Sequence, residues 1–375
     1  MKILLLTTHL EMGGIPIYLI NLSRGLKALG HSPVVASSGG GLQKRLIEEE
    51  IPHWRIPCRT SSELNPKLWL LAFPRLLQIT WRERPDLIHA HTRVSQVLAW
   101  ALSHTTGIPY VTTCHGLYRF RIGRRLFRCW GKSVMAISTP SMERLVKQYR
   151  LAPPHQVVLV KNGIEVDRFL QPAPQEEVAN FKESLGLKGQ PIIGAIARLS
   201  PVKGFEFLLK AVPTLLTAFP RLQVLLVGDG PQKPDLIRWA YELGIAEHLV
   251  ISHGVEDTRI PLATLDCFVA PALREGFGLA LVEAMAAGVP VVATNSGGPG
   301  EIIEDGRSGL LVPPGDPRAL GEAVLKLLTD PARRSQIAQA GRQRALEQFD
   351  MRRVVKEVEA VYARAANGQS SIGGR

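Results

Sequence analysis

The sequence lacks the features that mark a disulfide-bonded, zinc-binding or membrane-spanning protein. Its four cysteines stand singly, so they form none of the close pairs that are typical of zinc sites or redox dithiols. No run reaches the roughly 18 uninterrupted apolar residues of a transmembrane helix. The apolar opening segment is followed by Glu11, Gly13 and Gly14 where a signal peptide would need its cleavage site. We therefore expect a cytoplasmic protein with free thiols, for which any membrane contact is peripheral, at the inner face of the cytoplasmic membrane.

Acidic residues are scarce in the first half of the chain. Residues 1–165 hold 22 Lys and Arg against 9 Asp and Glu, whereas the remainder is close to neutral. A basic protein raises the question of nucleic-acid binding. The most basic run, 118–132, lacks interleaved stacking aromatics on a strand face, and no helix-turn-helix or zinc-finger spacing accompanies it. We expect no nucleic-acid partner.

Short apolar runs alternate with amphipathic stretches along the whole chain, which is the pattern of parallel sheets covered by helices. A segment rich in Pro, Gln and charge follows Arg168 and separates two such series. The sequence therefore predicts an α/β protein with two Rossmann-like domains, residues 1–170 and 171–350. Residues 351–375 would form a helix that could cross back to the N-terminal domain, and a loose tail. We expect ligands in a cleft between the domains, at the carboxyl ends of the strands.

The expected elements follow from apolar spacing and from bounding Gly, Pro and charged residues. Strands are predicted at 2–8, 33–36, 86–90, 110–113, 134–138, 157–161, 192–196, 223–227, 249–251, 267–270, 290–293 and 309–312. Helices are predicted at 15–29, 204–218, 231–243, 279–287, 317–329, 331–348 and 351–366.

The most informative segment, PALREGFGLALVEAMAAG at 271–288, follows a strand as a loop and then enters a helix. The first N–H groups of a helix have no intrahelical partners, and together with the helix dipole they can hold phosphate oxygens. The donors in question are those around Gly276, Phe277, Gly278 and Leu279. Glu275 lies in the loop, and Glu283 lies just over one turn into the helix, where it could accept hydrogen bonds from vicinal hydroxyls. Taken alone, Glu283 is equally consistent with a solvated helix residue.

A pair of cations precedes this segment. In ARLSPVKGFE, residues 197–206, Arg198 and Lys203 follow a predicted strand. Two such cations could neutralise a diphosphate and stabilise the charge that grows on it as a sugar leaves. If they were only surface charges, their loss would cost almost nothing.

At this point the sequence resembles the retaining GT-B glycosyltransferases of family 4, also called glycosyl transferases group 1. The resemblance covers nearly the whole chain and rests on EGFGLALVE, ARLSPVKG, VGDGP at 227–231, GGPGEIIEDG at 297–306, Gly13–Gly14, HAH at 89–91, CHG at 114–116 and KNGI at 161–164. The chain departs from the family pattern at Ala197, where many members have glycine, and at Ile15–Pro16, where polar residues are frequent.

The resemblance implies a role for each candidate. Arg198 and Lys203 would bind the donor diphosphate, Glu283 the ribose hydroxyls, and Glu275 the hydroxyls of the transferred sugar; Gly13 and Gly14 would direct N–H groups toward the diphosphate. His115 corresponds to the family's active-site histidine near the sugar and acceptor, unless it merely holds a loop. The leaving diphosphate itself would help to deprotonate the acceptor, so we name no enzymatic nucleophile.

No metal and no cofactor are expected. The HAH run at 89–91 has alternate histidines on a strand but no nearby Cys or acidic partner, which makes a weak ligand set. No Asp-x-Asp pair suited to a divalent ion and a diphosphate ends a strand of the first half. This agrees with diphosphate binding by Arg and Lys.

The basic run at 118–132 has two interpretations. On helical spacing its apolar residues Ile122, Leu126 and Trp130 line one face, as in an ordinary surface helix packed on a sheet. Alternatively, its cations bind an anionic membrane or guide a phosphorylated lipid-linked acceptor. These cations are Arg119, Arg121, Arg124, Arg125, Arg128 and Lys132.

The sequence thus predicts transfer from a nucleotide-sugar donor, with UDP preferred to GDP and ADP, to a saccharide or lipid-linked acceptor. The expected setting is cell-surface polysaccharide or lipopolysaccharide synthesis, by analogy of fold and charge. Two alternatives stay open. The same fold could serve a sugar-nucleotide epimerase or a sugar phosphorylase, or it could bind a nucleotide sugar without catalysis.

Overall fold

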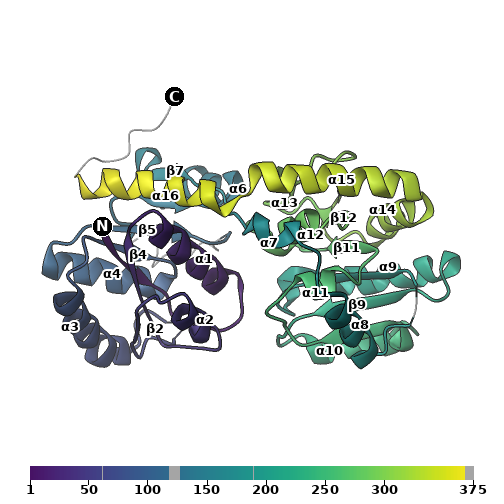
Figure 1. The fold of residues 1–375 in the computed structure, drawn as a ribbon, viewed down its shortest axis with the longest axis horizontal. Helices are drawn as coiled ribbons and strands as arrows, with labels where there is room; N and C mark the ends of the chain where they lie inside the picture. The colour runs from purple at the N-terminus through teal and green to yellow at the C-terminus, as the bar shows by residue number, and fades with distance from the viewer. Residues whose placement is uncertain (61, 118–126, 189, 368–375) are drawn as a thin grey trace. The chain divides into compact units, whose positions relative to one another are not determined.

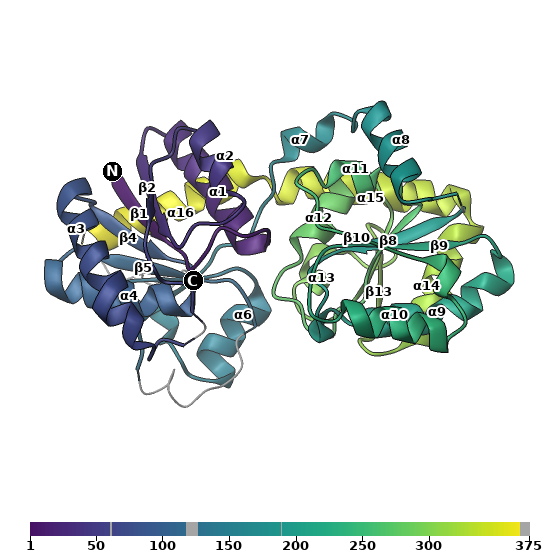
Figure 2. The same cartoon turned by 90° about the horizontal axis from the view of Figure 1, so that it is seen from below.

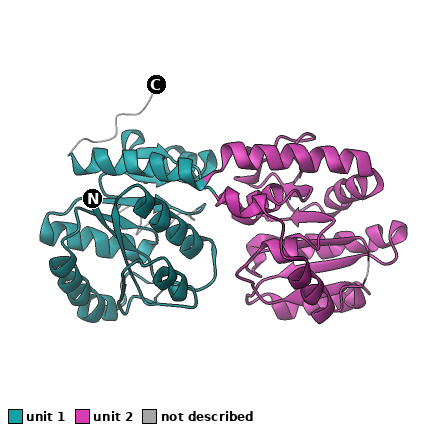
Figure 3. Cartoon of the chain, in the orientation of Figure 1, with its two compact units in different colours: residues 1–163, 351–375 teal, residues 164–350 magenta. Residues whose placement is uncertain are grey.

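The computed structural model describes residues 1–60, 62–117, 127–188 and 190–367. The chain divides into two compact units (Figure 3). The first unit comprises residues 1–163 and the segment that begins at Met351, and the second comprises 164–350, so the chain passes between the units twice. The first unit therefore ends before the expected boundary at residue 170, and the C-terminal helix belongs to it. Each unit is described by itself below.

The described part of the first unit contains a sheet of seven strands, all parallel, in the order β3-β2-β1-β4-β5-β6-β7. The strands are β1 (Lys2–Leu6), β2 (Ser32–Ser37), β3 (His53–Arg55), β4 (Leu87–Ala90), β5 (Tyr110–Cys114), β6 (Val134–Ala136) and β7 (Val157–Leu159). The central strands are buried on both faces and are mostly apolar, because helices cover both sides of the sheet.

The helices of the first unit form two layers (Figures 1 and 2). The core on one face joins the sheet to α1 and α16, and the core on the other joins it to α3 and α4. The helical segments are α1 (Gly14–Ala28), α2 (Gln43–Glu48), η1 (Leu68–Ala72), α3 (Phe73–Glu83), α4 (Arg93–Thr106), α6 (Thr139–Glu143), η2 (Arg144–Gln148), η3 (Pro154–Gln156) and α16 (Met351–Ala366).

The C-terminal helix α16 completes the first core. Its valines and Tyr362 are buried against α1, and Figure 1 shows the yellow α16 beside the purple α1. A Cβ atom on Gly25 of α1 would lie 2.4 Å from Cγ2 of Val355. The two helices therefore approach each other closely because Gly25 has no side chain.

The described part of the second unit contains six parallel strands in the order β10-β9-β8-β11-β12-β13. The strands are β8 (Ile192–Ile196), β9 (Gln223–Val227), β10 (Leu249–Ser252), β11 (Cys267–Ala270), β12 (Val291–Thr294) and β13 (Leu310–Val312). The helical segments are α7 (Val166–Leu170), α8 (Gln175–Ser184), η4 (Pro201–Lys203), α9 (Phe205–Ala218), α10 (Lys233–Glu242), η5 (Ala246–His248), α11 (Arg259–Leu262), α12 (Leu279–Ala286), α13 (Pro299–Ile302), α14 (Pro317–Thr329) and α15 (Pro331–Gln348).

The predicted elements agree with this structure to within a few residues at their ends, and the predicted α/β class is confirmed. Strand β3 was not predicted. Its sequence, His-Trp-Arg, has no apolar run, and it pairs at the edge of the sheet with β2. An edge strand that is only partly buried needs no apolar alternation, so it left no periodic signal.

Candidate functional site

The candidate residues fall into one set in each unit. In the second unit, β8 and β11 are neighbours and run parallel, so their carboxyl ends meet at one edge of the sheet. Arg198 and Lys203 follow β8, and Glu275 follows β11. The sheet order therefore places the two loops that carry the predicted charges next to each other.

Backbone contacts join these two loops. The N–H of Leu273 donates to the carbonyl of Val202 at 2.9 Å. Gly204 ends the turn with a φ of +66°, and a Cβ there would lie 2.1 Å from the carbonyl oxygen of Pro271. Only glycine fits such a close approach in a left-handed conformation. The turn that carries Lys203 is thereby held against the loop that carries Glu275.

Lys203 and Glu275 form an ion pair, in which Nζ donates to Oε2. The two side chains are only 24% and 20% exposed. The backbone of Glu275 is also fixed, because its N–H donates to Ser296 at 3.1 Å and its carbonyl accepts from Gly298 at 3.0 Å. The structure thus brings together two residues that the sequence places 72 positions apart.

The loop after Glu275 leads into α12 as predicted. Gly278 precedes the helix with a φ of 112°, and a Cβ on Gly298 would lie 2.3 Å from Cα of Phe277, whose ring is buried. No acceptor for the N–H groups of Gly276, Phe277 or Gly278 is found among the residues that the structure describes. This helix start can therefore donate hydrogen bonds to an anion. Leu279 is the first residue of α12, and Glu283 lies half-buried one turn later, with a partner of its own.

Arg198 is exposed, and within the described chain it has no hydrogen bond or ion pair. Its segment is supported by the VGDGP motif. The N–H of Leu199 donates to the carbonyl of Asp229, and a Cβ on Gly228 or Gly230 would lie 2.1 or 2.0 Å from a carbonyl oxygen of that segment. These glycines let β9 and the Arg198 segment lie in close contact, and the guanidinium stays available for a ligand.

Sequence reasoning missed a hydrogen-bonded pair at the same edge. Asp229 accepts a hydrogen bond from the N–H of Gly254 and pairs with Nδ1 of His253 at 2.6 Å. The bond from Gly254, followed by the bond from His253, lowers the pKa of the Asp229 carboxyl. The only signal in the sequence was an acidic residue between two glycines at a strand end.

In the first unit, Gly13 and Gly14 lie at the start of α1, which has neither a capping side chain nor an acidic residue in its first turn. His115 follows β5, and the ring of Tyr18 on α1 packs against it with its edge, at a centroid distance of 4.9 Å. The structure therefore brings the predicted histidine to the helix that carries the predicted glycine pair. Tyr18, which is 2% exposed, had no distinguishing signal in the sequence.

His115 belongs to a histidine array, by which we mean His89, His91 and His115. Nδ1 of His91 lies 3.0 Å from Nε2 of His115, and His89 bonds to Tyr362 and Thr113 at 2.7 and 2.8 Å. Burial lowers the pKa of each imidazole, and that of His115 falls to about 3. All three rings are therefore neutral at pH 7. No cluster of His, Cys, Asp and Glu suited to a metal occurs in the described residues.

Most of the basic run lies outside the described residues, namely Arg119, Arg121, Arg124 and Arg125. The described part, 127–132, is not helical, so the predicted helix does not extend to residue 132. Trp130 is 2% exposed and its indole N–H donates to the carbonyl of Leu151, which ties this segment to the body of the unit. In the described residues 127–132, a long-range hydrogen bond from Trp130 to Leu151 therefore holds the chain, and the helix suggested by the apolar spacing does not form there.

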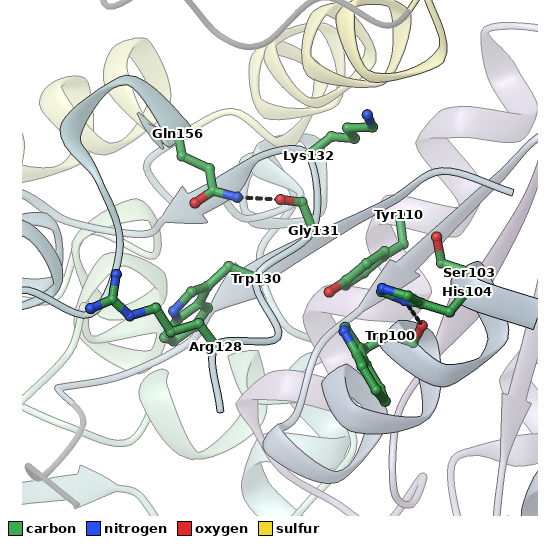
Figure 4. Close-up of a pocket in the computed structure, with 9 residues that line it drawn as sticks. All are labelled: Trp100, Ser103, His104, Tyr110, Arg128, Trp130, Gly131, Lys132 and Gln156. Atoms are coloured by element: carbon green, nitrogen blue, oxygen red, sulfur yellow. Dashed lines mark hydrogen bonds between the residues drawn. The ribbon is translucent and has the colours of Figure 1, made fainter. Parts of the chain in front are cut away.

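Arg128 and Lys132 are exposed and line a pocket of about 430 Å³. Figure 4 shows Arg128 and Trp130 on one side of this pocket and Trp100, Tyr110 and His104 on the other. The remaining described lining residues are Ser103, Gly131 and Gln156, so the described part of the lining contains no carboxylate. Tyr110 begins β5, whereas His115 follows its end, so the pocket and the histidine array lie at opposite ends of that strand.

Comparison with known families assigns both halves of the chain. Residues 12–168 match the model of Glycosyltransferase Family 4, and residues 177–344 match that of Glycosyl transferases group 1. The chain belongs to glycosyltransferase family 4. The resemblance seen in the sequence is thereby confirmed, and the protein is a glycosyltransferase.

The relatives of this glycosyltransferase are named for different acceptors. It is 38% identical over 200 residues to the GDP-mannose-dependent α-(1-6)-phosphatidylinositol monomannoside mannosyltransferase of Mycolicibacterium smegmatis. That match covers 51% of this chain and only 52%, about half, of the relative. It is 28% identical over 359 residues to the D-inositol 3-phosphate glycosyltransferase of Corynebacterium urealyticum, covering 89% of this chain and 81% of that protein.

A solved structure supports the fold. Anabaena HepE, determined in complex with UDP and glucose, superposes with a TM-score of 0.85 at 23% identity, over 97% of this chain and 99% of HepE. The family 4 enzyme therefore has the GT-B fold. Among its described residues, no helix is long and apolar enough to cross a membrane.

Proposed function

We propose that this glycosyltransferase transfers a sugar from a nucleoside diphosphate sugar to a saccharide or lipid-linked acceptor, with retention of anomeric configuration and without a metal ion. The observation that carries the proposal is the Lys203–Glu275 pair, which lies at the sheet edge that also carries Arg198 and the open start of α12. Such a site offers two cations and several N–H donors to a diphosphate, and a carboxylate to sugar hydroxyls.

The electrostatics favour diphosphate binding without a divalent ion. Negative charge develops on the phosphate as it leaves. Fixed cations and a helix N-terminus can stabilise this charge in place of a metal ion. We infer that Arg198 and Lys203 take that role and that the N–H groups of residues 276–279 complete the cradle. Glu283, one turn into α12, binds the ribose hydroxyls.

We propose that retention is achieved without an enzymatic nucleophile, because the acceptor attacks on the face of the sugar from which the diphosphate leaves. A double-displacement mechanism needs one carboxylate free to attack the sugar and a second to act as acid and base. Here Glu275 is held by Lys203, which suits a carboxylate that binds hydroxyls of the transferred sugar. We propose that the leaving diphosphate accepts the acceptor's proton on the same face of the sugar. For the first unit, we propose that His115 can bind a sugar hydroxyl and that Gly13 and Gly14 can direct N–H groups at a phosphate.

The donor test is thermal denaturation with UDP, GDP and ADP, each with and without Mg²⁺, backed by calorimetric titration. A ligand at 100 times its Kd stabilises the folded state by about 2.7 kcal/mol. We expect UDP to raise the Tm more than GDP or ADP does, with or without Mg²⁺. Arg198→Ala should lose this rise in Tm. Arg221→Ala, which alters an exposed arginine of the same unit, should keep it. A GDP preference would instead match the mannosyltransferase relative. No binding of any nucleotide would refute the donor site.

Product analysis tests the reaction itself. Retention predicts that the anomeric proton coupling of the product matches that of the donor sugar, with one free nucleoside diphosphate released per transfer. An epimerised nucleotide sugar, or a free sugar phosphate, would indicate the epimerase or phosphorylase alternative. Tight donor binding without turnover on any acceptor would indicate a binding protein.

We propose a lipid-linked acceptor in cell-surface glycan synthesis, with Arg128 and Lys132 binding its phosphate or an anionic membrane. The relative that acts on a phosphatidylinositol mannoside is consistent with such an acceptor. Each cation near anionic lipid contributes about 1 kcal/mol. Sedimentation with anionic and neutral vesicles over a salt series tests this proposal. The double variant Arg128→Gln/Lys132→Gln should bind anionic vesicles about tenfold or more weakly than the unaltered protein. The control Arg75→Gln, on the exposed face of α3, should bind them equally well. Equal binding to both vesicle types would refute it.

A further inference from the structure

The histidine array poses a question that the proposed roles do not answer, namely where the proton of His115 resides. An imidazole that is neutral carries one proton, on Nδ1 or on Nε2, and the hydrogen bond made by one nitrogen decides what the other can do. Nε2 of His115 faces Nδ1 of His91 at 3.0 Å. These two atoms share one proton, so exactly one of the rings donates.

The surroundings of His91 decide between the two arrangements. The side chain of His91 is 0% exposed, and its Nε2 is buried without a hydrogen-bond partner in the described residues. If His115 donated, His91 would have to carry its own proton on Nε2, as a buried N–H without an acceptor. If His91 donates, its Nε2 is a bare acceptor. Buried N–H groups without acceptors are the rarer of the two in proteins, so the second arrangement is favoured.

The backbone and the neighbouring rings hold His91 in place for this bond. The N–H of His91 donates to the carbonyl of Leu6 in β1 at 3.0 Å. Its ring packs against that of His89 at a centroid distance of 4.0 Å and stacks on that of His115 at 5.2 Å. His89 is itself fixed by its bonds to Tyr362 and Thr113. The donor that faces His115 is therefore fixed by β4, β1 and α16 together.

The other nitrogen of His115, Nδ1, has no partner in the described residues and is not fully buried. When Nε2 accepts the proton from His91, Nδ1 carries the proton of His115. Nδ1 is then a hydrogen-bond donor and has no lone pair with which to act as a base.

We propose that His91 is a positioning residue that donates from Nδ1 to Nε2 of His115 and holds His115 as its Nδ1–H tautomer, a hydrogen-bond donor toward a hydroxyl of the transferred sugar. The inference rests on the proposed function, which places His115 at that sugar. It agrees with proton removal by the leaving diphosphate, because His115 is then needed as a donor and not as a base.

The first test is independent of activity. The full-length protein is labelled with ring-¹⁵N histidine, and two-bond and three-bond correlations to the ring carbon-bound protons assign the tautomer of each ring. We expect protonated Nδ1 and unprotonated Nε2 in His115, and loss of that tautomer's signal pattern in His91→Leu. A protonated Nε2 in His115 of the unaltered protein would overturn the proposal, whatever the variants do.

Kinetics separates positioning from mere folding. In His91→Asn, the side-chain amide N–H can replace the Nδ1–H donor, whereas His91→Leu has no donor. We expect His91→Leu to lower kcat about tenfold with little change in the KM for the donor, and we expect His91→Asn to keep most of the kcat of the unaltered protein. His31→Asn, a control in the same unit, should have the kcat of the unaltered protein. If His91→Leu has the same kcat as the unaltered protein while His115→Ala is inactive, this inference is overturned and the proposed function stays intact. Full activity of His115→Ala would instead refute the role proposed for His115.

Discussion

The ion pair between Lys203 and Glu275 allows binding and catalysis to be separated. The ammonium of Lys203 is held by the carboxylate of Glu275, and both side chains are mostly buried. If Lys203 binds the donor diphosphate as proposed, Glu275 competes with the diphosphate for Lys203 and repels its charge. Glu275→Gln should remove both effects and tighten UDP binding by about 1.4 kcal/mol, or about tenfold. The same variant should lower kcat by at least about tenfold, because charge-assisted hydrogen bonds to the sugar are lost.

Lys203→Met should act in the opposite way. It removes a cation from the diphosphate site and leaves the Glu275 carboxylate 20% exposed and unpaired. Breaking a pair costs about 0–1 kcal/mol at the surface and about 3–5 kcal/mol when fully buried. We expect about 2 kcal/mol here, or a fall in Tm of about 4–8 °C for a unit of this size. The control Lys210→Met removes an exposed lysine of α9 and should change stability by less than about 0.5 kcal/mol.

The measurement is a double-mutant cycle in urea together with calorimetric titration of UDP. The unaltered protein, Lys203→Met, Glu275→Gln and the double variant give the coupling energy between the two side chains. We expect a coupling of about 1–2 kcal/mol. The reasoning fails if the coupling is below about 0.5 kcal/mol and Glu275→Gln binds UDP no more tightly than the unaltered protein.

Four further outcomes are expected. Arg198→Ala should weaken UDP binding by about 2 kcal/mol, measured by titration, with little change in Tm, since this exposed side chain has no partner within the described protein. Gly298→Ala should lower the free energy of unfolding by more than about 2 kcal/mol, because its Cβ would lie 2.3 Å from Cα of Phe277; a normal urea midpoint would contradict this. Tyr362→Phe should cost about 1–3 kcal/mol, because it leaves a buried imidazole nitrogen of the array unpaired, while Tyr241→Phe, at an exposed tyrosine, should cost almost nothing. The three histidines of the array have pKa values that are lowered in the folded state, so the unfolded chain binds more protons than the folded chain below pH 6.5. The free energy of unfolding, measured by urea denaturation, should therefore fall between pH 6.5 and pH 5.5 by about 1 kcal/mol for each of these histidines. A free energy that does not change with pH would contradict the neutral array.

Much of the fold was predictable because local patterns and long-range packing agree. Strands such as β9 and β11 are short apolar runs bounded by polar residues, and each was predicted with its correct ends. In the basic run, the helical prediction was wrong for the described residues 127–132, and for the opposite reason. Its apolar spacing suggested a helix, but Trp130 is pinned by a hydrogen bond to Leu151, and that contact cannot be read from local periodicity.

The candidate site divides in the same way. The residue types and their order along the chain were sufficient to select Arg198, Lys203, Glu275 and His115, because phosphate and sugar binding require cations, N–H donors and carboxylates after strands. The sequence alone thus determined the fold class and the family, and it supplied the candidate side chains of the proposed site.

Only the tertiary structure decided which of these groups meet. The parallel pairing of β8 with β11 brings Lys203 to Glu275, and the pairing of β4 with β5 brings His91 to His115. The return of α16 buries Tyr362 beside the array. These contacts join residues far apart in sequence, so they depend on strand order and on burial. Burial also holds the histidines neutral, because a low-dielectric interior disfavours the charged imidazolium.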